Sequence, residues 1–149
     1  MTFEDEIRKS ILELDFPPLL IDSPNEIVDK IASSFDWIGS KIDWGKTKNH
    51  RHLNLVGSDD DSLSLIKEFI IKNMDINHAI SVSQGICYIN DSSIDFCVYI
   101  TSSQFDEWLE FAYNNIPQHH YYFDEAQGWC LVITMEGNVD FGFSTKQYY

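Results

Sequence analysis

Regular alternation of apolar residues in the second half of the chain limits its possible folds more than any other feature. At least every second residue is large and apolar in 94–100, 129–135 and 139–143. This two-residue period is typical of β-strands that bury one face. Glu136, Gly137 and Asn138 separate the last two segments, so the sequence predicts a C-terminal β-hairpin. Further strands are predicted near 40–42, 53–57, 80–82, 86–89 and 119–123.

Four segments show the three-to-four-residue spacing of amphipathic helices. The first runs from Thr2, with Asp5 as its capping partner, to about residue 15. The second begins at Ser23 and Pro24, a typical N-cap and first helical position. The third follows the acids at 59–61, ends near 73 and turns Met74 inward, and the fourth runs between residues 101 and 117.

These elements predict an α+β fold. We expect a mostly antiparallel β-sheet with about four helices packed on one of its faces, ending in the C-terminal β-hairpin. The 149 residues fit a single domain, 1–149, because domains usually hold about 100–200 residues. A chain of this length buries enough surface to fold without a metal or a disulfide.

The cysteines and the apolar runs indicate a cytoplasmic protein. Cys87, Cys97 and Cys130 are odd in number and match no zinc or redox spacing, so we expect reduced, buried thiols. The first ten residues lack the basic and apolar regions of a signal peptide. No apolar run approaches the roughly 18 residues that a membrane span requires. We expect no cofactor.

Acidic residues dominate the charge, and they are unevenly distributed. The formal net charge is −14, from 24 acids and 10 Lys or Arg, and only one of those bases, Lys146, lies after residue 72. Binding to a phosphate backbone or to an anionic membrane requires clustered bases, so both partners are disfavoured.

The acids of the second half lie next to aromatic residues. They occupy the outer face of the fourth predicted helix, the segment that follows Tyr121–Phe123, the hairpin turn and the strand after it. One interpretation is a solvated surface that keeps the protein soluble. The other is a docking face for a basic partner, in which aromatics anchor and charge steers. The predicted contact set on that second interpretation is Asp106, Glu107, Glu110, Tyr122, Asp124, Glu125, Glu136 and Asp140. The segment 1–15 and the acids at 59–61 are alternative docking sites.

A search for catalytic chemistry finds no P-loop, dinucleotide-binding or nucleophile-elbow motif. His50 and His52 would share one face of a strand, but a metal site needs a third ligand, for which Asp43 or the acids at 59–61 are the candidates. The adjacent His119 and His120 would point to opposite faces of a strand. The sequence therefore predicts no metal site and no enzyme.

The segment 121–143 resembles a stretch of the small bacterial immunity proteins that belong to polymorphic toxin and contact-dependent growth inhibition systems. The resemblance covers Tyr121-Tyr122-Phe123 and the hairpin WCLVITMEGNVDFGF at 129–143. It implies a cytoplasmic, non-enzymatic protein that binds and neutralises one cognate toxin.

A nuclease is the expected toxin class, because nucleases are basic where they bind phosphates. We expect a monomer that binds the toxin domain one-to-one and covers its active site or substrate groove. The alternatives are an acidic nucleic-acid mimic, an adaptor, and a small metal-dependent enzyme that uses His50, His52 and an acid.

Overall fold

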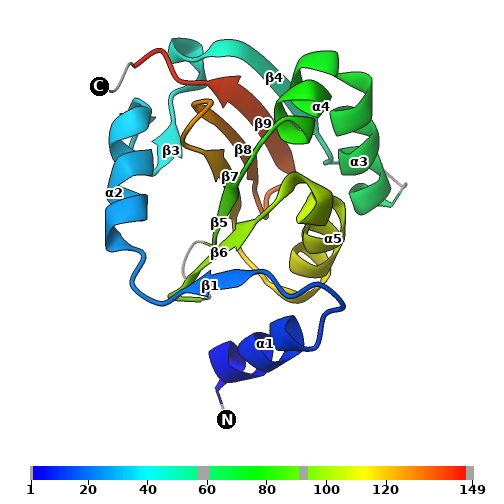
Figure 1. The fold of residues 1–149 in the computed structure, drawn as a ribbon. Coiled ribbons are helices and arrows are strands. Elements are labelled where there is room, and N and C mark those ends of the chain that lie inside the picture. Colours follow the sequence, from blue (N-terminus) through cyan, green and yellow to red (C-terminus); the bar gives the residue numbers. More distant parts are fainter. Residues whose placement is uncertain (1, 57–60, 91–93, 147–149) are drawn as a thin grey trace.

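Seven antiparallel strands form the central sheet of the protein, as Figure 1 shows. The computed structural model describes residues 2–56, 61–90 and 94–146. The sheet order is β1-β6-β5-β7-β8-β9-β4, and β2 and β3 form a separate two-stranded hairpin. The strands are β1 (Leu19–Ile21), β2 (Trp37–Ile38), β3 (Lys41–Ile42), β4 (Lys48–Asn54), β5 (Ile86–Asn90), β6 (Cys97–Ile100), β7 (His120–Asp124), β8 (Trp129–Ile133) and β9 (Asn138–Phe143).

The part of the chain that the structure describes contains five α-helices, one more than the four predicted. Two short 3-10 turns, η1 (Trp44–Lys46) and η2 (Ser102–Gln104), accompany them. The α+β class, the antiparallel sheet and the C-terminal hairpin are confirmed. The helices are α1 (Phe3–Leu12), α2 (Asn25–Ser34), α3 (Ser62–Lys72), α4 (Met74–Ser81) and α5 (Phe105–Asn115).

The additional helix, α4, lies where the sequence predicted that a strand begins at Ile80. Ile76, Ala79 and Ile80 are buried on one side of it, at helical spacing. Val82 is outside the helix, and the predicted inward position of Met74 is wrong because its side chain is 84% exposed. A short apolar run does not by itself distinguish a strand from a helix, which explains the error.

Both faces of the sheet are covered, which corrects the prediction that the helices pack on one face. The side chains of α3, α4 and α5, with those of α1, pack on one face in the larger core. The helix α2 and the β2–β3 hairpin cover part of the opposite face, where Ile31, Phe35 and Ile42 contact Phe123 and Val132.

The strands β7, β8 and β9 are neighbours in the sheet and pair in simple register. Tyr122 lies opposite Leu131, and Leu131 lies opposite Phe141. Because directly opposed residues point to the same face, Leu131 and Phe141 enter the larger core together with Tyr122. The strand β8 ends at Ile133, earlier than predicted, and Met135 is exposed in the turn.

Local capping explains where three of the helices begin. Thr2 and Asp5 form the predicted capping box of α1. Asp61 accepts a hydrogen bond from the backbone of Leu63 at the start of α3. Thr101 pairs with Gln104 in a capping box at η2, directly before α5.

The predicted cap of the second helix is wrong. The helix α2 begins at Asn25, and Pro24 rather than Ser23 occupies its N-cap position without a side-chain hydrogen bond. A proline has a fixed φ that suits the entry to a helix, so this start does not depend on a serine cap.

None of the helices in the described ranges has both the length and the apolar character that crossing a membrane requires.

Leu131 provides a test of the central register. We expect Leu131→Ala to lower the free energy of unfolding by about 2–5 kcal/mol, because it leaves a cavity between Tyr122 and Phe141. The matched control, Met135→Ala in the exposed turn, should change it by less than about 0.5 kcal/mol. Equal losses in urea denaturation of the two variants would contradict the burial assigned to β8.

Candidate functional site

The structure separates the eight residues predicted as partner contacts. Tyr122 is fully buried, with ring centroids 5.1 Å from Tyr88 and 5.2 Å from Phe105. Burial raises the pKa of its hydroxyl well above the usual range. The prediction that Tyr122 anchors a partner is therefore corrected, because the side chain lies in the core.

Two of the predicted acids are also internal. Asp124 is 2% exposed and accepts hydrogen bonds from the hydroxyl of Ser83 and from both the backbone and the side-chain nitrogen of Gln127, at 3.1 and 3.0 Å. Asp140 is buried against His50 and His52. Both carboxylates thus stabilise the fold rather than face a partner, which corrects their predicted placement.

Glu125 and Glu136 are exposed, but they lie at opposite ends of the sheet. Glu125 is in the turn after β7 and pairs with Lys30 of α2 at 3.1 Å. Glu136 is in the turn after β8, with its carboxylate 3.7 Å from His119. Because β7 and β8 are antiparallel neighbours, the two turns lie at opposite ends of these strands.

The three predicted acids of α5 are exposed on one helix, and a lysine of α3 bonds two of them. The ammonium of Lys67 lies 3.2 Å from Glu110 and 3.5 Å from Asp106. Burial alone would lower the pKa of Lys67, but the hydrogen bond to Glu110 and the charge of Asp106 raise it above its usual value. Glu107 makes no ion pair among the described residues.

Glu107 lies next to apolar side chains of the segment between α1 and β1. Phe16 and Glu107 line the same shallow crevice. Phe16 is 70% exposed and Leu12 is 65% exposed. Glu13 and Asp15 are exposed beside them and form no ion pair within the described ranges. We call the set Leu12, Glu13, Asp15, Phe16 and Glu107 the acidic–apolar surface. It overlaps the alternative docking segment 1–15 and extends it to α5.

Contacts on both sides hold this surface in place. The side-chain amide of Gln104 donates a hydrogen bond to the backbone carbonyl of Phe16 at 3.2 Å, which fixes the loop to the start of α5. Ile7 and Ile11 bury the inner side of α1 in the larger core. Phe16 is absent from the predicted contact set because the exposure of a lone aromatic has no sequence signal.

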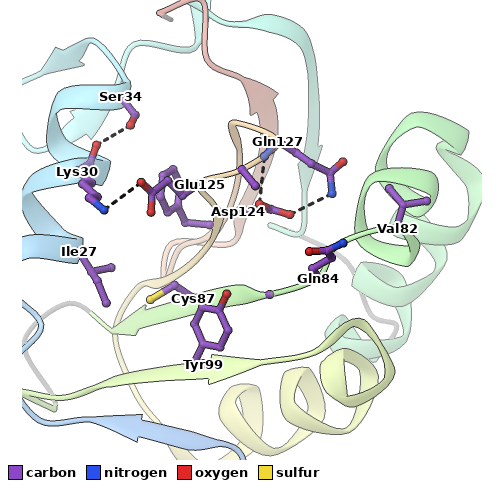
Figure 2. Close-up of a pocket in the computed structure, with 13 residues that line it drawn as sticks. Ile27, Lys30, Ser34, Val82, Gln84, Cys87, Tyr99, Asp124, Glu125 and Gln127 are labelled. Carbon is purple, nitrogen blue, oxygen red and sulfur yellow. Dashed lines mark hydrogen bonds and ion pairs between the residues drawn. The ribbon is translucent and has the colours of Figure 1, made fainter. Parts of the chain in front are cut away.

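An open pocket of about 990 Å³ lies on the opposite face, between α2 and the strands β5, β6 and β7, as Figure 2 shows. Its charged lining consists of the Lys30–Glu125 ion pair and the hydrogen-bonded Asp124. Cys87 is its only cysteine in the described residues, and hydrogen bonding to Cys97 together with burial raises the pKa of the Cys87 thiol. A thiol that stays protonated is a poor nucleophile.

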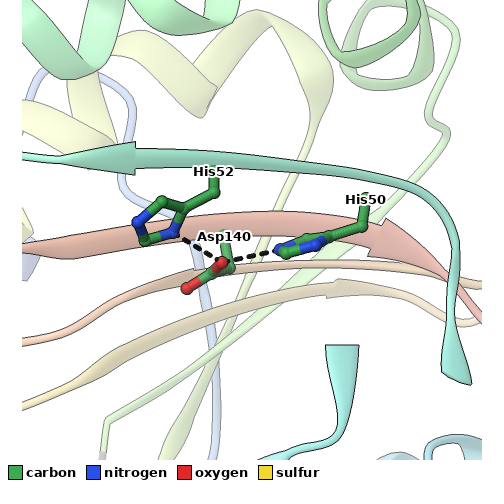
Figure 3. Close-up of side chains that lie close together, drawn as sticks. All are labelled: His50, His52 and Asp140. Carbon is green, nitrogen blue, oxygen red and sulfur yellow. Dashed lines mark hydrogen bonds and ion pairs between the residues drawn. The ribbon is translucent and has the colours of Figure 1, made fainter. Parts of the chain in front are cut away.

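The two strand histidines converge on one carboxylate, as Figure 3 shows. Nε2 of His50 and Nδ1 of His52 lie 2.7 and 2.9 Å from the same oxygen of Asp140. The third residue of the cluster is Asp140, and not one of the acids predicted for this role. Asp43 caps η1 and Asp61 caps α3 instead. The other two predicted candidates, at positions 59 and 60, lie outside the described residues.

The adjacent histidines 119 and 120 contact different partners. His120 is buried on β7, with Nδ1 2.6 Å from the hydroxyl of Tyr88, and burial lowers its pKa to about 4. His119 precedes the strand and accepts a hydrogen bond from the backbone of Met135 at 3.1 Å. They do not form a shared site.

Comparisons with known proteins found no match among protein-family models, curated proteins or solved structures. Function is therefore inferred from the geometry and from the charge of the molecule.

Removing the buried hydroxyl of Tyr122 tests its placement in the core. That oxygen has no hydrogen-bond partner among the described residues, so Tyr122→Phe should leave stability unchanged or raise it by about 1–3 kcal/mol. Thermal denaturation measures the change. Tyr88→Phe, which breaks the bond to His120, is the matched control and should destabilise. A clear loss of stability in Tyr122→Phe would show that this hydroxyl has a partner.

The low pKa of His120 predicts a decline in stability at mildly acidic pH. Below pH 6.5 the unfolded chain binds a proton at His120 that the folded chain does not bind until about pH 4. The free energy of unfolding should therefore fall across this window, by on the order of 2–3 kcal/mol. Denaturation at several pH values should show a weaker fall in His120→Asn and an unchanged fall in the exposed control His78→Asn. If the free energy of unfolding falls equally with pH in the unmodified chain and in both variants, His120 is not the group responsible.

Proposed function

We propose that this protein is an immunity protein that binds one basic toxin domain, one-to-one, through the acidic–apolar surface. The observation that carries this proposal is the exposure of Phe16, at 70%, beside Glu13, Asp15 and Glu107. Those three carboxylates have no cationic partner among the described residues. Exposed aromatics near uncompensated charge are typical of surfaces that bind another protein.

Two physical terms would act together at this surface. Leu12 and Phe16 lose water on contact, which supplies affinity at about 25 cal/mol per Å² of apolar area. The carboxylates attract a basic partner over the Debye length of about 8 Å at physiological salt, and this raises the association rate. A toxin that binds nucleic acid presents the basic groups that such an inhibitor requires.

The acids on the outer side of α5 would contribute less. Asp106 and Glu110 already neutralise Lys67, so a toxin cation would have to compete with that lysine. Glu107 lies on the side of α5 that faces the α1–β1 loop, and it makes no ion pair among the described residues. We therefore rank Glu107, Glu13 and Asp15 above the other acids as contacts.

The resemblance of segment 121–143 to immunity proteins supports the same function, and it implies a cytoplasmic, non-enzymatic inhibitor that covers the active site or substrate groove of a nuclease. The buried apolar hairpin that carries the resemblance lies inside the protein. Its role in this proposal is to support the fold, and the contacts come from other elements.

A charge-reversal pair tests the surface directly. The probe is the basic polypeptide encoded next to the gene for this chain, purified and titrated at low and at physiological salt. We expect Glu13→Lys with Glu107→Lys to weaken binding roughly tenfold or more and to slow association, because both changes repel a cation. Phe16→Ala should weaken binding mainly by accelerating dissociation.

The matched control is Glu26→Lys with Asp29→Lys, which changes net charge equally on exposed positions of α2, at the opposite face. This control should retain the affinity of the unmodified chain at physiological salt. Equal losses of affinity in the two double variants would show that only the overall charge matters, and would contradict the proposed surface. Failure of the basic polypeptide to bind at all would contradict the inhibitor function, and competition by plain duplex DNA would favour a nucleic-acid mimic instead.

A further inference from the structure

A second site, unrelated to the acidic–apolar surface, lies at the other edge of the sheet. There, His50 and His52 of β4 meet Asp140 of β9, and their nearest ligand atoms all lie within 4.8 Å of one another. The two ring nitrogens approach a single carboxylate oxygen, at 2.7 and 2.9 Å. Three donor atoms thus converge on one small volume.

The pairing of β4 with β9 brings these residues together. His52 lies directly opposite Asp140 in the ladder. An irregularity between Lys48 and Arg51 inserts one extra residue into β4, and Asn49 within it has a φ of +55°. Such a bulge redirects side chains, and here it accompanies the approach of the His50 ring to the same carboxylate.

The surroundings fix two of the three groups while leaving the site accessible. Asp140 is held on β9, which is paired on both sides, and its side chain is only 12% exposed. The ring of His50 stacks on Trp44, with centroids 5.3 Å apart and planes 8° from parallel. The side chains of His50 and His52 remain 34% and 46% exposed, so an ion and its water ligands can reach them.

This set of donors matches the chemistry of a divalent transition-metal ion. Two imidazole nitrogens and one carboxylate oxygen are a common ligand set for zinc and for nonhaem iron, with water completing the coordination. Calcium and magnesium prefer oxygen ligands, so they fit this set poorly. We propose that His50 Nε2, His52 Nδ1 and one carboxylate oxygen of Asp140 bind a divalent transition-metal ion such as Zn²⁺.

Without a metal, the same three residues satisfy a buried carboxylate by hydrogen bonding. The two possibilities differ in what they predict for added metal. Hydrogen bonding alone gives no preference for Zn²⁺ at this place. A coordination site binds one ion per chain and ties the edge strand β4 to β9, so metal should raise the melting temperature.

Titration of the full chain with Zn²⁺, followed by calorimetry and by thermal denaturation, tests the proposal. We expect one bound ion per chain, and a loss of affinity of roughly 100-fold or more in His50→Gln and in His52→Gln, because each removes a direct ligand. Co²⁺ should give visible absorption bands that these variants lose. Asp140→Asn is a weaker test because its burial can compromise folding.

The exposed His78→Gln, on α4 outside the cluster, is the matched control and should keep the affinity and the metal-induced rise in melting temperature. His119→Gln is a second control, because His119 and Glu136 form a histidine–carboxylate pair outside the cluster. This variant should also keep the affinity for Zn²⁺. Zn²⁺ binding that is absent, or that is equally strong in the His50 and His52 variants, would overturn the proposal. Neither result would affect the inhibitor proposal, whose contacts lie elsewhere.

Discussion

Burial of both faces of the central sheet governs which residues its strands can hold and how the helices are placed around it. All five residues of β8 are buried. Trp129, Leu131 and Ile133 enter the core beneath α3, α4 and α5, whereas Cys130 and Val132 pack toward α2. A sheet covered on both sides needs apolar residues at successive positions, and the hydrophobic effect then stabilises both layers at once.

This double burial leaves little of the central sheet available for function. The buried charged or titratable groups Asp124 and His120 on β7 are hydrogen-bonded internally, Asp124 by Ser83 and Gln127 and His120 by Tyr88. The accessible chemistry is therefore displaced to the edges and to the connections between elements. Of the acidic groups on the central strands, Asp140 alone among the described residues has exposed histidines as partners, because β9 lies next to the edge strand β4.

The two proposed sites lie toward opposite edges of the sheet. The acidic–apolar surface adjoins β1, the first strand in the sheet order, and the histidine cluster involves β4, the last. This separation suits an inhibitor that presents one face to a toxin, since a metal at the far edge would stabilise β4 without occupying the contact surface. A catalytic use of the metal would belong to a different function, and it would require a substrate pocket beside the cluster.

Sequence patterns alone identified most of the elements. Alternation identified β5 to β9, and helical spacing with capping residues identified α1, α3 and α5, because these signals depend on neighbours close in the chain. The same local information failed at α4, where a short apolar run fits either a helix or a strand. It also failed to show that α2 crosses to the second face of the sheet.

The candidate sites depended much more on tertiary structure. The acidity of the chain was visible in the sequence, as was the placement of His50 and His52 on one face of a strand. The burial of Tyr122 was not visible, because an aromatic residue on a strand can face either the core or the solvent. Asp140 could not be matched to the histidines either, because 88 residues separate it from His52 and only the register of β4 on β9 joins them. The charge and the local elements follow from composition and short-range spacing, so the sequence is sufficient to predict them. Which acids face solvent and which side chains meet depends on strand order and on how each face is covered, and these arise from contacts between distant segments.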